Sequence, residues 1–258
     1  MRQVGAHDVP TLHAESPDGV LVAYRVHGDA VTDAPSPPVL LVHGFASNAA
    51  ITWEGTGWVR SLADARRSAI VVDLRGHGDS DKPVDADDYA PERLGGDLVA
   101  VLDSAGVGVV DVVGYSMGNR VVSALTELAP ERVRRVVIGG AGPDELFASW
   151  DLDDARGVLE RDEPARNPVI EQVLRPAITA GADREALLAC IEGVSGAPLL
   201  IPGDIPTLFV AGEDDPVPQG ARELALEWDA DYVSIPGRDH VSTLTSRAFK
   251  DAAIAFLA

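Results

Sequence analysis

The sequence predicts an α/β fold in which an open, mostly parallel sheet is covered by helices on both faces. Apolar runs of strand length alternate with helical patterns along most of the 258 residues. This alternation is typical of parallel strands joined by crossover helices. Several of the runs are continuously apolar, as strands buried on both faces are. The alternation stops over residues 142–204, where only helical patterns occur.

The first part of the chain contains most of the expected strands. In chain order we expect strands at 10–16, 20–28 and 39–45, a buried strand from 68 that runs into a glycine-rich loop, a helix at 91–105, a strand at 107–116, a helix at 117–130 and a strand at 131–140. An irregular helical pattern occupies 52–65. The helix at 91–105 has the clearest ends, because Pro91 suits its first turn and Gly106 follows its last.

The second part begins with the helical insertion and then returns to the alternation. Within the insertion, Asn167 is a suitable N-cap for one helix, Asp183 caps a second, and Gly193 would stop it. A strand from residue 205, a helix at 218–229, a strand at 231–237 and a last helix from 240 to the C-terminus follow. We therefore expect a core domain of residues 1–141 and 205–258 and a helical cap of residues 142–204.

Composition and charge limit the location and the partners. The formal charge is −20, from 41 acidic against 21 basic residues, and so negative a chain repels phosphate backbones and anionic lipid. The single cysteine, Cys190, excludes a disulfide within the chain, which suits a reducing cytoplasm. The N-terminal stretch lacks the apolar core of a signal peptide. We expect a cytoplasmic protein that binds a small molecule, neither nucleic acid nor membrane.

One serine stands where a buried strand gives way to a helix. The segment Gly114-Tyr-Ser116-Met-Gly118 fits the pattern G-x-S-x-G, which is the turn that exposes a nucleophilic serine. Two glycines relieve crowding in that strained turn. The free N–H groups of the following helix favour negative charge at the same point. The alternative is a glycine-rich turn whose serine does nothing.

A nucleophilic serine needs a histidine base and a carboxylate that orients the base. Of six histidines only His240 follows Ser116, and it lies just past the final strand. The loop after the preceding strand offers Glu213, Asp214 and Asp215. We choose Asp215, because three residues beyond Gly212 leave room for the chain to clear the strand and turn back. Asp214 and, after another strand, Asp144 remain alternatives. Asp239 adjoins the base, and we expect it to be exposed.

Five segments in order, LLVHGF, DLRGHGDSDKP, GYSMG, PTLFVAGEDD and IPGRDH, resemble the α/β-hydrolase superfamily. The resemblance covers essentially the whole chain and implies an eight-stranded type of sheet with a helical cap at 142–204. It implies Ser116 as nucleophile, His240 as base and Asp215 as the triad acid.

The resemblance also implies the oxyanion hole, the pair of N–H groups that bind developing negative charge. These are the backbone N–H groups of Met117 and Phe45, and Gly44 allows the sharp turn that points the second one into the cleft. Phe45 and Tyr115 are expected to form apolar walls that contact substrate. We interpret His43 as a structural residue that braces this loop.

Other motifs fail on their spacing, so we expect no cofactor and no metal ion. RGHGDS lacks the third glycine of a dinucleotide-binding loop, and its neighbours Asp73 and Arg75 are expected to be structural. DLDDARG begins like a calcium loop, but Ala155 stands at the third ligand position. No His/Cys cluster has the spacing of a zinc site.

The expected reaction is hydrolysis of a small or medium-sized apolar carboxylic ester, thioester or lactone through an acyl-enzyme. Serine at the nucleophile position argues against the epoxide hydrolase and haloalkane dehalogenase branches, which use a carboxylate. Cofactor-free haloperoxidases or perhydrolases and C–C bond hydrolases are the alternatives. Tyr115 and Asn119 depart from the GNSMGG of most C–C hydrolases. A catalytically idle binding protein is a further alternative, and the oligomeric state stays open.

Overall fold

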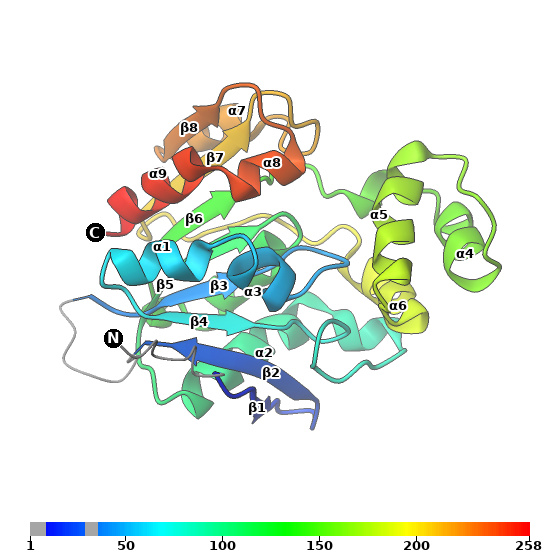
Figure 1. Cartoon of the computed structure of the whole chain (residues 1–258), viewed down its shortest axis with the longest axis horizontal. Helices are drawn as coiled ribbons and strands as arrows, with labels where there is room; N and C mark the ends of the chain where they lie inside the picture. The colour runs from blue at the N-terminus through cyan, green and yellow to red at the C-terminus, as the bar shows by residue number, and fades with distance from the viewer. Residues whose placement is uncertain (1–8, 29–35) are drawn as a thin grey trace, which may run out of the picture.

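The sheet at the centre of the computed structural model has its strands in the order β1-β2-β4-β3-β5-β6-β7-β8 (Figure 1). The structure describes residues 9–28 and 36–258, so the first eight residues of the segment searched for a signal peptide lie outside it. The strands are β1 Leu12–Glu15, β2 Leu21–His27, β3 Val39–Val42, β4 Ala69–Val72, β5 Val110–Tyr115, β6 Val133–Gly139, β7 Thr207–Gly212 and β8 Asp231–Ile235.

The sheet is mostly parallel, as predicted. β1 pairs with β2 and β2 with β4 in antiparallel fashion, and every later pair, from β4–β3 to β7–β8, is parallel. Every residue of β3, β4, β5 and β7 is buried, which explains why β3 and β4 are unbroken apolar runs. Asp111 in β5 and Thr207 in β7 are buried polar residues within these strands. The carboxyl ends of β3, β5, β6 and β7 therefore meet along one edge of the sheet.

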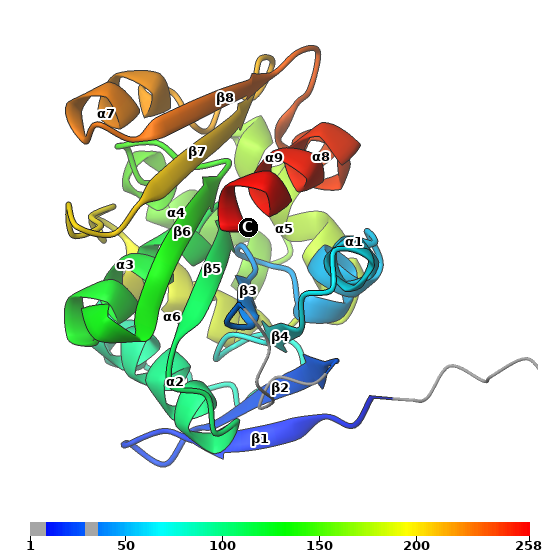
Figure 2. The same ribbon diagram turned by 90° about the vertical axis from the view of Figure 1, so that its left-hand side faces the viewer.

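Helices cover both faces of this sheet (Figure 2). On one side lie α2 Pro91–Ser104, α3 Gly118–Leu128 and α7 Ala221–Glu227; on the other lie α1 Trp58–Asp64, α8 His240–Thr245 and α9 Arg247–Leu257. Successive strand residues feed the two layers alternately, so Val112 packs in the first layer and Val113 in the second. None of the helices in the described ranges is both long and apolar enough to cross a bilayer.

Two expected helices are each divided in the structure. The last helix is interrupted at Ser246, whose extended backbone ends α8 and whose hydroxyl accepts from the N–H of Phe249 to cap α9. The irregular pattern at 52–65 forms a π-helical turn, η1 Ala50–Glu54, and then α1, separated by Gly57 in the left-handed region at φ 80°. Both breaks are local cap and turn signals inside a continuous helical pattern.

Between β6 and β7, the described residues form helices and no strand. These are η4 Phe147–Ser149, α4 Leu152–Glu160, α5 Pro168–Thr179 and α6 Arg184–Val194, and they lie beyond the carboxyl edge of the sheet (Figure 1). Asn167 and Asp183 cap α5 and α6 with their side chains, as predicted. The segment that begins like a calcium loop is instead the capped start of α4, with Asp151 at its N-cap.

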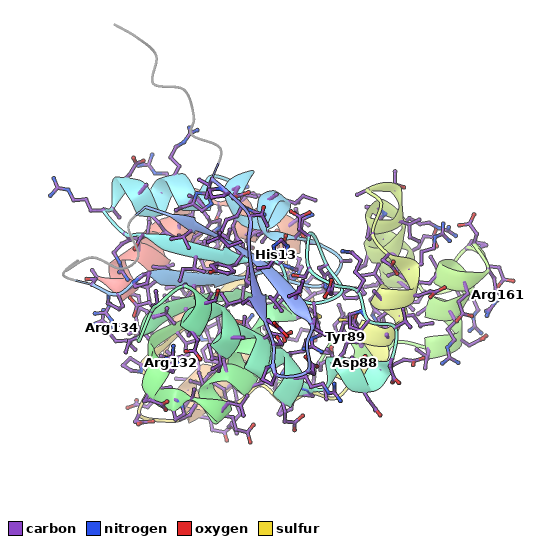
Figure 3. All side chains as sticks on the ribbon, turned by 90° about the horizontal axis from the view of Figure 1, so that it is seen from below. His13, Asp88, Tyr89, Arg132, Arg134 and Arg161 are labelled. Carbon is purple, nitrogen blue, oxygen red and sulfur yellow. The ribbon has the colours of Figure 1, made fainter. Side chains whose placement is uncertain are left out.

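Gly193 does not stop α6, contrary to the sequence prediction, because the helix continues to Val194. A Cβ at position 193 would lie 2.3 Å from the Ala86 carbonyl oxygen and 2.6 Å from Cβ of Tyr89. The glycine therefore serves close packing of the cap against the short helix η2, Ala86–Tyr89. Figure 3 shows Tyr89 at the junction between the core and the cap.

The opposite end of the molecule is closed by ion pairs. Figure 3 shows Arg134 and Arg132 there, far from Arg161 on the cap. Arg132, in the turn η3 Pro130–Arg132, donates to backbone carbonyls before β5. Arg134 donates from Nε to the fully buried carboxylate of Asp111 at 2.8 Å, and Arg67 donates to the same carboxylate. Ion pairs with Asp111 thus stabilise the amino edge of the sheet. The candidate site lies at the opposite, carboxyl edge, next to the cap.

Candidate active site

Ser116 occupies a strained turn between β5 and α3. It follows the last residue of β5, and its φ is +53°, in the left-handed region that non-glycine residues rarely adopt. Its own N–H donates to the carbonyl oxygen of Gly139 at the end of β6, at 2.9 Å. The serine is partly exposed. Backbone strain of this kind costs of order 1–3 kcal/mol and concentrates at active sites.

Three glycines make this turn possible. A Cβ on Gly118 would lie 2.4 Å from the carbonyl oxygen of His43, and one on Gly114 would lie 2.4 Å from Oδ1 of Asn119. A Cβ on Gly44 would lie 3.1 Å from Cβ of Ser116. The loop after β3 therefore passes directly beside the serine, and larger residues would force the two apart.

The structure brings Asp215 and His240 together. Nδ1 of His240 lies 2.8 Å from Oδ2 of Asp215, whose other carboxylate oxygen accepts from the N–H of Val217 at 2.9 Å. The Asp215 side chain is fully buried, whereas the His240 side chain is 28% exposed. A buried carboxylate held at both oxygens can fix the tautomer and the orientation of an imidazole.

Backbone hydrogen bonds join the loops that carry these two residues. The N–H of Glu213 donates to Ile235 O and that of Asp214 to Arg238 O, each at 3.0 Å. The side chains of Asp214 and Asp144, the alternative acids, are on exposed residues. Asp239 is exposed too, and it caps α8 by accepting from Ser242. Of the candidate carboxylates, Asp215 is the one that contacts the base.

The serine and the base approach each other across the end of β6. A Cβ on Gly140 would lie 3.0 Å from Cε1 of His240, and the preceding residue accepts from the N–H of Ser116. Within the described residues no hydrogen bond joins Ser116 Oγ to Nε2 of His240. Such bonds are often long in free enzymes and tighten when substrate binds.

Two backbone N–H groups beside the serine are available to an anion. Neither the N–H of Phe45 nor that of Met117 donates to another group in the described part of the chain. Met117 immediately precedes α3, so its N–H is at the positive end of that helix. The close approach of Gly44 to Ser116 brings the Phe45 segment to the same place. These are the donors that the sequence analysis proposed for the oxyanion hole.

Two buried histidines hold the loop that contains Phe45. Nδ1–H of His43 donates to Gly44 O at 2.7 Å, and its Nε2 accepts from Leu74 N–H at 3.0 Å. Nε2 of His77 accepts from Ala46 N–H at 3.1 Å, and its Nδ1–H faces the Arg75 carbonyl oxygen. These partners assign one neutral tautomer to each ring.

Burial keeps both of these histidines neutral. Burial, followed by the proximity of His43, lowers the pKa of His77 to about 3, and burial also lowers the pKa of His43. A buried histidine with both ring nitrogens occupied is a structural brace for the loop. Among the described residues no group of three His, Cys, Asp or Glu side chains could hold a metal ion.

The cap contributes aromatic side chains that the sequence analysis missed. The ring of Phe45 lies 4.7 Å from that of Phe147 and 6.3 Å from that of Trp150, centroid to centroid. Cys190 of α6 lies 3.8 Å from Met117, the residue after Ser116, sulfur to sulfur. Aromatic residues are only 5% of the chain, so two of them at the start of the insertion were an available signal.

Tyr115 does not line the substrate side as expected. It is 4% exposed, its hydroxyl donates to the backbone carbonyl of His240, and its ring packs on the imidazole and on Phe249. The reason is strand alternation, because the side chain of Tyr115 shares a face with Val113 in the layer beneath α9. Of the two expected walls, Phe45 alone contacts the aromatic side chains of the cap.

A cavity of about 210 Å³ opens between the cap and the loops after β3 and β4. Ser47 and Asp79 line it from the core, and Ala177 and Asp183 line it from the cap. Ala46, which follows Phe45, also lines it. Neither Ser116 nor His240 is among the residues that line it, so this cavity lies beside the candidate catalytic groups and does not contain them.

More than half of the chain matches one family model, described as alpha/beta hydrolase fold, over residues 37–180. A 2-hydroxymuconate semialdehyde hydrolase of Pseudomonas putida is 36% identical over 40% of this chain and 36% of its own length. A putative 2-succinyl-6-hydroxy-2,4-cyclohexadiene-1-carboxylate synthase of Bacillus subtilis is 31% identical over 52% of this chain and 45% of its own. Epoxide hydrolase 3 of Siraitia grosvenorii is 33% identical over 39% and 31%.

These matches span less than half the length of each of the three relatives. The solved structure of a hydrolase from Pseudomonas aeruginosa PA01 aligns with 98% of this chain and 100% of its own, at a TM-score of 0.74 and 26% sequence identity. This structural match supports the fold of nearly the whole chain. The relatives in sequence carry names of different reactions, so they do not identify the reaction of this chain.

Proposed function

The chain belongs to the alpha/beta hydrolase family, and on that premise we propose that it is a serine hydrolase of small or medium-sized apolar carboxylic esters, thioesters or lactones. The observation that carries the proposal is the hydrogen bond between Asp215 and His240 at the sheet edge that presents Ser116 in a strained turn. Serine rather than a carboxylate at position 116 supports acyl transfer over epoxide opening.

In the proposed first step His240 accepts the hydroxyl proton of Ser116 at Nε2 while Oγ attacks the substrate carbonyl. The oxyanion of the tetrahedral intermediate accepts hydrogen bonds from the N–H groups of Phe45 and Met117. His240 then protonates the leaving alcohol, thiol or lactone oxygen, and the acyl group stays on Ser116. Asp215 remains ionised throughout and stabilises the imidazolium.

In the proposed second step water replaces the leaving group. His240 removes a proton from water, the resulting hydroxide attacks the acyl carbonyl, and a second tetrahedral intermediate forms at the same donors. Its collapse breaks the bond to Oγ, which regains the proton from His240. The products are the carboxylic acid and the free enzyme, so protons and electrons balance without a cofactor.

The apolar acyl group is supported by the aromatic side chains that pack on Phe45, the residue after Gly44. Phe45, Phe147 and Trp150 form an aromatic cluster where the loop after β3 meets the cap. Such surfaces favour an apolar ligand with a few polar contacts.

The single cysteine also supports a cytoplasmic location, which cell fractionation would test.

A C–C bond hydrolase is the second candidate. Its support is the relationship to the Pseudomonas putida hydrolase, named for a semialdehyde substrate. Ser116, deprotonated by His240, would attack a ketone carbonyl, and the carbon leaving group would take that proton from His240 in place of an alkoxide. Assay of a ring-cleavage dienoate ketone beside the ester panel separates the two, because each candidate requires turnover of its own substrate.

The test is a panel of p-nitrophenyl esters, thioesters and lactones graded by acyl length, with Ser116→Ala as the matched variant. We expect wild-type turnover that peaks at short or medium apolar acyl groups. Ser116→Ala should abolish that turnover while thermal unfolding stays close to wild type, since only one oxygen is removed. Activity retained by Ser116→Ala would exclude Ser116 as the nucleophile.

A further inference from the structure

We propose that Tyr115 is a positioning residue for the base, an inference that rests on the serine-hydrolase function proposed above. Its phenol donates a hydrogen bond to the backbone carbonyl of His240. Its ring centroid lies 5.1 Å from that of the imidazole, with 44° between the planes. Tyr115 therefore touches both the main chain and the ring of His240, and it directly precedes Ser116 in the chain.

The base needs such support because it stands on a short, partly exposed helix. His240 is the first residue of α8, which is only six residues long, and its side chain is 28% exposed. The contact with Asp215 fixes one ring nitrogen and leaves the position of the main chain to other groups. A displacement of about 1 Å in a catalytic group costs rate on the order of 100-fold.

The two ends of α8 are each held by an aromatic donor. The Tyr115 hydroxyl donates at the first residue, and Nε1–H of Trp58 donates to the carbonyl oxygen of Leu244 near the last, at 2.9 Å. The rings of Trp58 and Phe249 pack edge to face with their centroids 4.8 Å apart, and the centroids of Phe249 and Tyr115 are 6.0 Å apart. Trp58, Phe249 and Tyr115 therefore form a continuous row of aromatic rings that contacts α8 at both ends.

The slot for Tyr115 is shaped by two glycines at the end of β6. A Cβ on Gly140 would lie 2.8 Å from Cζ of Tyr115 and 3.0 Å from Cε1 of His240. A Cβ on Gly139 would lie 2.7 Å from Cδ2 of the same tyrosine. The carbonyl oxygen of Gly139 also accepts a hydrogen bond from the N–H of Ser116. The end of β6 therefore contacts Ser116, Tyr115 and His240.

Burial keeps the tyrosine in its donor form. Tyr115 is 4% exposed, and burial, reinforced by the charge of Asp215, raises the pKa of its phenol well above the usual value. The hydroxyl therefore keeps its proton over the working range of a hydrolase. Its acceptor, the His240 carbonyl, carries no titratable proton, so the contact persists while the imidazole gains and loses one.

The test is Tyr115→Phe, which removes the hydroxyl and keeps the ring, with Tyr24→Phe as the matched control. Tyr24 lies in β2 and is 2% exposed, and its hydroxyl forms a hydrogen bond of 2.9 Å with the hydroxyl of Ser104 in α2. This contact involves none of the proposed catalytic residues. We expect Tyr115→Phe to lower kcat about 10- to 100-fold with KM within about twofold. Tyr24→Phe should leave both constants unchanged while losing a similar amount of thermal stability.

A second measurement does not depend on turnover. The proton on Nδ1 of His240, held by Asp215, gives a downfield NMR resonance that reports the orientation of the ring. We expect Tyr115→Phe to shift or broaden that resonance and Tyr24→Phe to leave it in place. An unchanged resonance in Tyr115→Phe would overturn the positioning role, whatever the substrate.

The two measurements distinguish failure of this inference from failure of the proposed function. Wild-type turnover with equal kcat in Tyr115→Phe would overturn the positioning role and leave the serine hydrolase intact. A wild-type protein inert toward esters and toward a fluorophosphonate probe would overturn the proposed function. The Nδ1 resonance would then decide by itself whether Tyr115 positions His240.

Discussion

Replacing Asp215 with asparagine should disable the base through its tautomer. Oδ1 of Asp215 accepts from the N–H of Val217 at 2.9 Å, and Oδ2 faces Nδ1 of His240 at 2.8 Å. In Asp215→Asn the amide oxygen is retained by the Val217 N–H, so the NH₂ group faces the imidazole. Nδ1 must then accept, which moves the ring proton to Nε2, the atom that should receive the proton of Ser116.

The wrong tautomer should cost about 10⁴-fold in kcat, the size of effect seen when a serine-protease triad loses this carboxylate. That factor corresponds to about 5.5 kcal/mol of transition-state stabilisation. Asp214→Asn is the matched control, because Asp214 is exposed one residue away, and its kcat/KM should stay within about twofold of wild type. The assay is hydrolysis of p-nitrophenyl butyrate with the unfolding temperature measured in parallel.

Asp215 is not the orienting acid if Asp214→Asn loses as much rate as Asp215→Asn, or more. A larger loss in Asp214→Asn would move the acid by one position. Equal, small losses would mean that neither carboxylate orients the base. A collapse of the unfolding temperature in Asp215→Asn would instead be read from the parallel melt, so that lost folding is not counted as lost chemistry.

Two further predictions concern stability. Below pH 6.5 the unfolded chain binds protons that native His77, with a pKa of about 3, and native His43 do not, so the free energy of unfolding should fall as pH drops from 6.5 toward 4.5. Urea titrations should show a shallower fall in His77→Gln, and parallel curves would contradict this. Asp111→Asn should lose about 3–5 kcal/mol because it leaves the guanidinium groups of Arg67 and Arg134 without their buried carboxylate. Chemical unfolding measures that loss, ester turnover by the folded fraction should not change, and a loss below about 1 kcal/mol would show that the pairs contribute little.

The sheet was predictable because its strands are buried on both faces. Such strands carry few polar residues, because each buried polar group needs a partner, as Asp111 has in Arg67 and Arg134. Runs such as 39–42 and 69–72 therefore stand out in the sequence. Helix interruptions were less visible, because Ser246 acts through a single hydroxyl inside a continuous helical pattern. Gly193 was misread because its role is a close approach to Tyr89, which lies about a hundred residues earlier in the chain.

The site was predictable to the extent that chain order and sheet edge determine it. Those two criteria selected Ser116 and His240, and the spacing of three residues from Gly212 selected Asp215. The structure places Asp215 and His240 in contact. The contacts of Tyr115 and Phe147 depend on which helix covers which face and on how the cap folds back. Strand alternation places Tyr115 on the same face as Val113, but local spacing does not show which side chains meet it there. The contact of Phe147 with Phe45 likewise depends on tertiary packing.

Ser116 is proposed to be an activated nucleophile, and reaction with a fluorophosphonate probe measures that activation. Incubation of the folded protein with the probe, followed by intact mass measurement and peptide mapping, reports both the number and the position of adducts. We expect one adduct, on the peptide that carries Ser116, with none in Ser116→Ala and much slower labelling in Asp215→Asn. A wild-type protein that stays unlabelled, or that is labelled on another residue, would contradict the claim.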